Sequence, residues 1–428
     1  MTPGTPGTPG APGPQTRTGL VRAVTYPLRL GEVGEDWRST RFGRLALVNV
    51  LSSAGDALVV VALAGSVFVS VPLTAARGRT ALGLVCTLLP FAVVAPLIGP
   101  AADRTRRGKR FVMFLAAVGR TAAAVMMAAW LHSLLLFPAA FLSLVCSKTH
   151  GVARSSLVPG SMDGHLNLVR ANSRLAVGAG VSSAVAAAAG GAVYAVFGSR
   201  PVLQIDAFVF AVTAATAILV PRPVEPEPGP EPATAPGAPD PARPRLGLSR
   251  PALTVTALRG ATGFLTALIA FGFRAQSTPV VWYGVAAAAG LAGSLAGSAL
   301  APAARRLVRS DGWLVAVPAL AVAVAAALVI LLGSGQHRLG AAALAASAGL
   351  GGSVAKTAFD SLVQSSVTER RRAQAFARFE AQFQGAWVVA ALVPTLIAVP
   401  LTAGFAIVGV AVAVAGAGLA ARLVRSRG

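Results

Sequence analysis

Charged residues are scarce in this sequence. Only 12% of its 428 residues are Asp, Glu, Lys or Arg, whereas 55% are hydrophobic. A soluble globular protein carries about 25% charged residues, so this chain has too few to cover a soluble surface. Its 46 glycines instead favour helices that approach one another closely in lipid. The composition therefore argues against an ordinary soluble domain and predicts a membrane protein.

Reactive and metal-binding residues are also scarce. The two cysteines, Cys86 and Cys146, lie far apart in apolar segments, and the four histidines are scattered along the chain. None of them has the spacing of a metal site. The sequence also lacks a Gly-rich phosphate-binding loop that ends in Lys followed by Ser or Thr. We therefore expect no cofactor, no metal ion, no ATP hydrolysis and no enzymatic activity.

Long apolar runs make up most of the chain. A helix needs about 20 mainly apolar residues to cross a bilayer. Runs of this length without alternation predict helices, because lipid leaves no partner for unpaired backbone groups. We predict twelve transmembrane helices, at 45–71, 80–98, 111–131, 134–153, 175–197, 202–220, 253–273, 280–304, 313–332, 339–358, 379–399 and 402–421.

A Pro- and Glu-rich segment, residues 221–250, divides these spans into two groups of six. Its composition is typical of an extended linker. We expect an all-α membrane protein with two pseudo-symmetric six-helix halves, residues 41–220 and 251–424. The Pro/Gly-rich residues 1–40 are expected to form a disordered tail.

Positive charge is distributed on one side of the predicted membrane. The formal net charge is +22, which would also suit a protein that binds nucleic acid. If both termini are cytoplasmic, however, the connections on the opposite side contain only Arg77, Arg79, Arg200, Arg274 and Arg338. This is the positive-inside pattern of a multi-pass protein in the plasma membrane. Topology accounts for the charge, so we expect no nucleic-acid partner.

Two similar loops suggest an internal repeat. The segment "PAADRTRRGKRFV" at 100–112 aligns with "PAARRLVRSDGWLV" at 302–315, so that Pro100 matches Pro302 and Arg104 matches Arg306. Parallel repeats of this kind place a binding site between the halves, near the middle of the bilayer. Coincidence between two Arg-rich loops is the alternative.

Residues 40–425 resemble the major facilitator superfamily across nearly their whole length. The segments "SSAGDALVVVAL" and "RRRAQAFARFEAQFQGAWVVAALVP" are similar to those of its drug-exporter-like bacterial branch. The stretch "GPAADRTRRGKR" resembles the signature loop of the family, with two additional residues before the second glycine. The loop positions of interest are Gly99, Asp103, Arg104, Arg107, Gly108, Lys109 and Arg110.

The resemblance implies a role for this loop. Asp103 would be the carboxylate of a gate, and Arg104 and Arg107 its partners. The second copy carries Arg305 in place of Asp103, so we assign the gate to the first copy alone. The alternative is that the loop only fixes the topology.

Ionisable residues inside predicted spans are functional candidates, because charge within a bilayer is unfavourable. Asp56 lies near the middle of the first span and suits reversible protonation or contact with a solute; a neutral, hydrogen-bonded Asp is the alternative. Arg120 is a candidate counter-ion for Asp56, and it and Arg259 could equally serve packing or reach the interface. Glu380 and Gln384 share a helical face that could line a cavity or form an interfacial pair.

Together these features predict a monomeric secondary transporter that works by alternating access. We expect proton-coupled export of small amphipathic or hydrophobic compounds, through a cavity with walls mostly of Ala, Val, Gly and Leu. The expected partners are a small-molecule substrate, a proton or other coupling ion and the lipid bilayer. An importer of a small metabolite and a receptor or assembly protein that transports nothing are the alternatives.

Overall fold

The computed structural model describes residues 41–63, 84, 106–131, 133–162, 167–220, 246–279, 281–308, 310–332 and 337–425. These residues form helices and connections, and they contain no strand. The helices are α2 (Arg41–Leu63), α6 (Arg106–Ala129), α7 (Leu136–Ser161), α8 (Leu168–Phe197), α9 (Ser199–Ile218), α10 (Leu246–Ala275), α11 (Val281–Leu307), α12 (Asp311–Leu331), α13 (His337–Ser366), α14 (Glu369–Leu396) and α15 (Leu401–Arg425).

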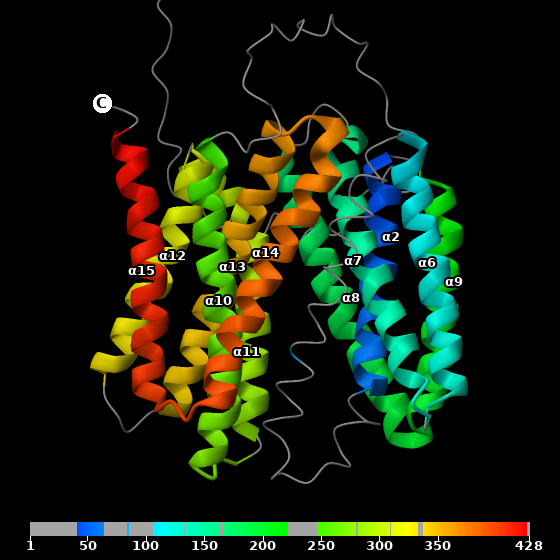
Figure 1. The fold of residues 1–428 in the computed structure, drawn as a ribbon, viewed down its shortest axis with the longest axis horizontal. Coiled ribbons are helices and arrows are strands. Elements are labelled where there is room, and N and C mark those ends of the chain that lie inside the picture. Colours follow the sequence, from blue (N-terminus) through cyan, green and yellow to red (C-terminus); the bar gives the residue numbers. More distant parts are fainter. Residues whose placement is uncertain are drawn as a thin grey trace, which may run out of the picture.

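These helices form two bundles that lie side by side (Figure 1). Helices α2 and α6–α9 pack together in the N-terminal half, and α10–α15 pack together in the C-terminal half. The halves meet where α8 packs against α11 and α13, and where α7 packs against α13 and α14. Every predicted span has a helix here except 80–98, of which only residue 84 is described. The all-helical prediction is therefore confirmed.

Local sequence signals account for the helix boundaries. Asn167 caps α8, because its side-chain oxygen accepts a hydrogen bond from the backbone N–H of Arg170 at 2.8 Å. A single residue, Gly198, separates α8 from α9, and its φ of 78° lies in the left-handed region that glycine adopts without strain. The chain can therefore reverse direction between these helices without a longer loop.

We call the end of the molecule at which α9 ends and α10 begins the linker end (Figure 1). Several helices extend beyond their predicted spans toward it. Helix α13 continues to Ser366 rather than 358, and α14 begins at Glu369 rather than 379. Helix α10 begins at Leu246, within the predicted linker. The predicted span of α13 stopped before Asp360 and Gln364. The helix continues through them because Asp360 pairs with Lys356 and Gln364 bonds Asn172.

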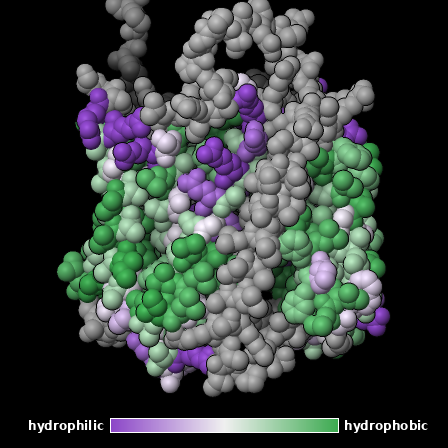
Figure 2. Space-filling model, in the orientation of Figure 1, coloured by the Kyte–Doolittle hydropathy of each residue, from purple (hydrophilic) through white to green (hydrophobic). Residues whose placement is uncertain are grey.

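Apolar side chains cover the sides of the helices, and hydrophilic residues gather near the ends (Figure 2). Phe208, Val196 and Val414 are 70%, 72% and 69% exposed, which is favourable only where lipid surrounds the helix. Nine of the described helices are long and apolar enough to cross a membrane. Helices α13 and α14 are not among these nine.

Candidate functional site

A cavity of about 620 Å³ lies between the two halves. Its walls are formed by α2, α7 and α8 of the N-terminal half and by α10, α11, α13 and α14 of the C-terminal half. Residues from the two halves face each other across it. The N-terminal lining is Asn49, Ser52, Ser53, Asp56, Ser147, Lys148, His150, Gly151, Val152, Arg154, Ser155, Asn172, Leu175, Ala176 and Gly180. The C-terminal lining is Val255, Leu258, Arg259, Thr262, Leu291, Ser294, Leu295, Ser298, Ala348, Gly349, Gly352, Ser353, Lys356, Thr357, Asp360, Phe376, Glu380 and Trp387.

The lining corrects the expectation of apolar walls. Helices α2 and α7 contribute mainly hydroxyl, amide and charged side chains, whereas Leu and Val residues come mostly from α10 and α11. Polar residues inside a membrane protein turn toward the bundle interior, because lipid cannot hydrogen-bond them. Overall hydropathy therefore described the outer surface of the helices and not the cavity.

Asp56 and Arg120 lie together in the N-terminal half. Arg120 donates a hydrogen bond from Nη2 to Asp56 Oδ1 at 2.5 Å and from Nη1 to Ser52 Oγ at 2.7 Å. The guanidinium is 1% exposed and lies 3.7 Å above the ring of Phe210, whereas the Asp56 side chain is 48% exposed. Asp56 therefore faces the cavity, and Arg120 is its buried counter-ion, as the sequence suggested.

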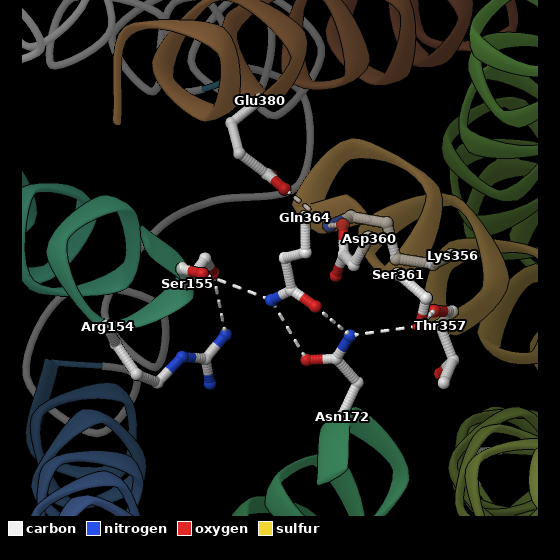
Figure 3. A network of polar contacts seen from close by, with 9 residues as sticks. All are labelled: Arg154, Ser155, Asn172, Lys356, Thr357, Asp360, Ser361, Gln364 and Glu380. Atoms are coloured by element: carbon white, nitrogen blue, oxygen red, sulfur yellow. Dashed lines mark hydrogen bonds and ion pairs between the residues drawn. The ribbon is translucent and has the colours of Figure 1, made fainter. Parts of the chain in front are cut away.

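A second charged group joins α13 to α14 on the opposite wall (Figure 3). Lys356 Nζ lies 2.6 Å from Asp360 Oδ1 and 2.6 Å from Glu380 Oε1. Lys356 and Asp360 are one turn apart on α13, and Glu380 adds a second carboxylate from the next helix. One cation that holds two carboxylates fixes the relative positions of α13 and α14 at the cavity.

Not every candidate residue of the C-terminal half lines the cavity. Arg259 is exposed and faces the cavity, and Trp387 also lines it. Of the predicted pair on α14, Glu380 lines the cavity and Gln384 does not.

Most of the signature loop lies outside the described residues. This applies to Gly99, Asp103 and Arg104, whereas Arg107 and Gly108 lie in the first turn of α6 and Arg110 follows them there. The second copy of the repeat forms the connection between α11 and α12. There Arg305 Nε lies 3.0 Å from Asp311 Oδ1, within the C-terminal half.

The N-terminal wall contains residues that the sequence analysis missed. Arg154 of α7 donates a hydrogen bond from Nη1 to Asn49 Oδ1 of α2 at 2.6 Å, and His150 is buried one turn before it. A usable signal was present, because polar or small residues recur at helical spacing within α7, at Ser147, Gly151 and Arg154.

Amide side chains connect the halves between this cavity and the linker end (Figure 3). Asn172 of α8 donates to Gln364 Oε1 of α13 at 2.7 Å, and Gln364 Nε2 donates back to Asn172 Oδ1 at 3.2 Å. Gln364 Nε2 also donates to the backbone oxygen of Ser155 at 3.0 Å, and Asn172 to Ser361 Oγ at 3.2 Å. We call Ser155, Asn172, Ser361 and Gln364 the amide seal.

The amide seal should set how often the linker end opens. Replacing Gln364 with leucine removes the hydrogen bonds to Asn172 Oδ1 and to the backbone oxygen of Ser155, and leaves Asn172 only its bond to Ser361. Leaving half-buried polar groups unpaired in this way costs about 1–3 kcal/mol. We expect the population open at the linker end to rise by about fivefold to a hundredfold. Distances between spin labels on α8 and α13, in a variant without Cys86 and Cys146, measure this change.

Gln382→Leu is the matched control for that variant. Gln382 of α14 donates to Thr256 Oγ1 of α10 at 2.9 Å, so both partners belong to the C-terminal half. Its replacement should leave the distances unchanged. Equal distance distributions in Gln364→Leu and the unaltered chain would show that the amide seal does not hold the halves together.

Sequence comparison finds mycobacterial relatives. A protein of Mycobacterium leprae is 30% identical over 420 residues, which cover 89% of this chain and 70% of that protein. A protein of Mycobacterium tuberculosis is 37% identical over 196 residues, 42% of this chain. That alignment spans about a third of the tuberculosis protein, 34% of its length.

Structural comparison finds transporters of the same fold. The human organic anion transporter MFSD10 superposes with a TM-score of 0.64 and 16% identity, covering 88% of this chain and 99% of its own. A bacterial homologue of the iron transporter ferroportin in the outward-facing state superposes with a TM-score of 0.65 and 16% identity. That match covers 90% of this chain and 98% of the homologue. The sequence profile of the Major Facilitator Superfamily matches residues 45–391. With two helical bundles around a central cavity, the chain belongs to the major facilitator superfamily of membrane transporters.

Proposed function

We propose that this chain is a proton-coupled secondary transporter that exports small amphipathic compounds carrying an anionic group. The cavity between the halves is the observation that supports this proposal. Its volume of about 620 Å³ suits a small molecule. Its hydroxyl, amide and charged residues face Leu258, Leu291 and Leu295 across the cavity, an arrangement that suits a compound with a polar and an apolar end.

The charge of the lining favours an anion. Four cationic side chains line the cavity, Lys148, Arg154, Arg259 and Lys356, against the three carboxylates Asp56, Asp360 and Glu380. Lys356 and Arg120 hold the carboxylates through ion pairs. Within the described helices, no hydrogen bond or ion pair occupies the guanidinium of Arg259, which is exposed to the cavity. Arg259 is therefore the proposed contact for the anionic group.

The proposed orientation has both termini and the linker end in the cytoplasm of the cell that carries the chain in its plasma membrane. The one-sided distribution of Lys and Arg supports it. In this conformation the amide seal would close the cytoplasmic side. Asp56, which is half exposed to the cavity, is the proposed carboxyl for exchange of the coupling proton, and Asp103 remains the proposed gate carboxylate.

Growth inhibition by a panel of chemically diverse toxic compounds tests this proposal. An efflux-deficient host would carry the unaltered chain, Asp56→Asn, Arg259→Gln, Arg250→Gln or empty vector at matched abundance in the membrane. We expect the unaltered chain to protect against anionic compounds and Asp56→Asn to protect against none. Loss of a charge-assisted hydrogen bond, worth about 1.5–3 kcal/mol, should weaken the affinity of Arg259→Gln by about tenfold to a hundredfold.

Arg250→Gln is the control, because Arg250 is exposed on the same helix and does not line the cavity. Its protection should equal that of the unaltered chain. If no compound distinguishes the unaltered chain from empty vector, the proposal that the chain exports toxic compounds is wrong.

Import of a small hydrophilic metabolite is the second candidate function. The same lining favours it, since fixed ion pairs and amides recognise a polar solute more readily than an apolar one. Uptake of labelled metabolites into vesicles with an imposed proton gradient distinguishes import from export.

A further inference from the structure

Asp206 of α9 is a buried carboxyl that has no role in the cavity. It is 0% exposed, and neither Oδ1 nor Oδ2 has a hydrogen-bond partner within the described helices. A carboxylate ion in such a position would lose its hydration and gain no donor in return, which is strongly unfavourable. The carboxyl is therefore better accommodated with a proton.

The surroundings of Asp206 contain one cation and a second acid. Phe210, one turn after Asp206 on α9, lies against the guanidinium of Arg120. Arg120 in turn bonds Asp56, and its own Nε is buried without an acceptor in the described part of the chain. Cys146 of α7 lies beside Arg120, near Gly119.

The other charged side chains on the packed helices lie elsewhere. Helix α9 packs against α2, α6 and α8. Their remaining charges lie in the first turns of these helices, at the linker end, whereas Asp206 lies toward the opposite end of α9. Those charges belong to Arg41, Arg44, Arg106, Arg107, Lys109, Arg110, Arg170 and Arg174. At the same end as Asp206, Arg200 lies in the first turn of α9 and is exposed, and Tyr194 of α8 packs against the apolar cluster around Ala207. Among described residues, Asp206 therefore interacts electrostatically with Asp56 and Arg120.

One arginine between two acids determines the charge of this cluster. If both carboxyls are ionised, the buried cluster has a net negative charge, whereas one proton makes it neutral. We propose that Asp56 and Asp206 form a proton site that holds one proton between them, with Arg120 bonded to whichever carboxyl is ionised. In the present structure Arg120 bonds Asp56 and the proton is on Asp206.

This assignment deepens the proposed function, on which its role in transport rests. Asp56 reaches the cavity and can exchange protons with water there, whereas Asp206 is sealed inside the N-terminal half. When Arg120 turns to Asp206, the proton moves to Asp56 and the total stays at one. The position of a single guanidinium would then decide whether the proton faces the cavity.

Infrared spectroscopy of the purified full chain tests the proton site without a known substrate. A protonated carboxyl has a carbonyl-stretch band that an ionised carboxylate lacks. We expect one such band at neutral pH, and we expect Asp206→Asn to remove it. In Asp56→Asn, Arg120 loses its partner and turns to Asp206, so the band should also be lost at neutral pH and return on acidification.

Asp311→Asn is the control, because Asp311 pairs with Arg305 at 3.0 Å in the other half and should not change the band. A band that persists unchanged in Asp206→Asn overturns the proposal, as does one that persists in Asp56→Asn at neutral pH. If Asp206→Asn does not fold, the spectrum of Asp56→Asn still decides the question. A chain with the expected bands that moves no proton with any solute would refute the proposed function and leave the proton site intact.

Discussion

Replacing Gly293 or Gly297 with alanine should strongly destabilise the protein, even though alanine favours helices. A Cβ atom at Gly293 would overlap the backbone carbonyl of Ala346, and one at Gly297 would overlap that of Leu350. Backbone atoms cannot move aside as a flexible side chain can. We expect each substitution to lower the free energy of unfolding by about 1–3 kcal/mol, and the double substitution to lower it by more.

The physical reason is the close approach of α11 and α13. In lipid the hydrophobic effect does not hold helices together, so close packing and hydrogen bonds do. Ser294 and Ser353, whose hydroxyls are 2.7 Å apart, lie at the same contact. Thermal unfolding of the purified protein in detergent measures the loss of stability.

Gly284→Ala provides the control on the same helix. Apart from neighbouring residues of its own helix, no described atom lies within 4 Å of a Cβ at Gly284. This substitution should therefore stabilise α11 by about 0.5–1 kcal/mol through its effect on the unfolded chain. The same chemical change thus has opposite signs at two sites of one helix. If Gly293→Ala and Gly284→Ala behave alike, α11 and α13 do not make this contact.

Lys356→Met is expected to have the second large effect. It removes the cation that lies 2.6 Å from both Asp360 and Glu380 and leaves two neighbouring carboxylates without it. Breaking a buried ion pair costs about 3–5 kcal/mol. The side chains of Lys356, Asp360 and Glu380 are 20%, 14% and 31% exposed. Because water screens part of the charge interaction, we expect the free energy of unfolding to fall by about 2–4 kcal/mol.

A double-mutant cycle tests whether that loss comes from charge. Glu380→Gln removes one of the two carboxylates, so the combination with Lys356→Met should be more stable than the two single losses predict. Lys356→Arg keeps the positive charge and should retain most of the stability. Additive losses would show that Lys356 contributes by packing and not through its ion pairs.

Apolar run length was sufficient to predict the helices. The outer face of each helix must be apolar along its full length in lipid, and this alone identified all described helices. The same criterion misplaced helix ends at Glu369 and Ser366. In the missed end of α13, Asp360 pairs with Lys356 and Gln364 bonds Asn172. Hydropathy along the chain does not distinguish such an inward polar residue from the end of a span.

The cavity was harder to predict for a related reason. Asp56 and Arg120 were found because single charges within apolar runs are conspicuous. Asn49 and Asn172 carry no charge; Asn49 lies between two valines, and Asn172 lies in the polar stretch 170–174, outside the predicted spans. Only their positions relative to other helices reveal their role. Asp206 lies close to the end of a predicted span, at 202–220, where a charge is less conspicuous. Its burial and the neighbouring Arg120 make it part of a charged cluster.

The amide seal has a consequence for how the protein responds to its surroundings. Dissolved ions weaken attraction between opposite charges over about 8 Å at physiological ionic strength, but they scarcely affect hydrogen bonds between neutral amides. Asn172 and Gln364 also neither gain nor lose protons between acid and neutral pH. The amide seal would therefore remain equally tight at low and high ionic strength, so a cell under osmotic stress would keep the linker end closed to the same degree.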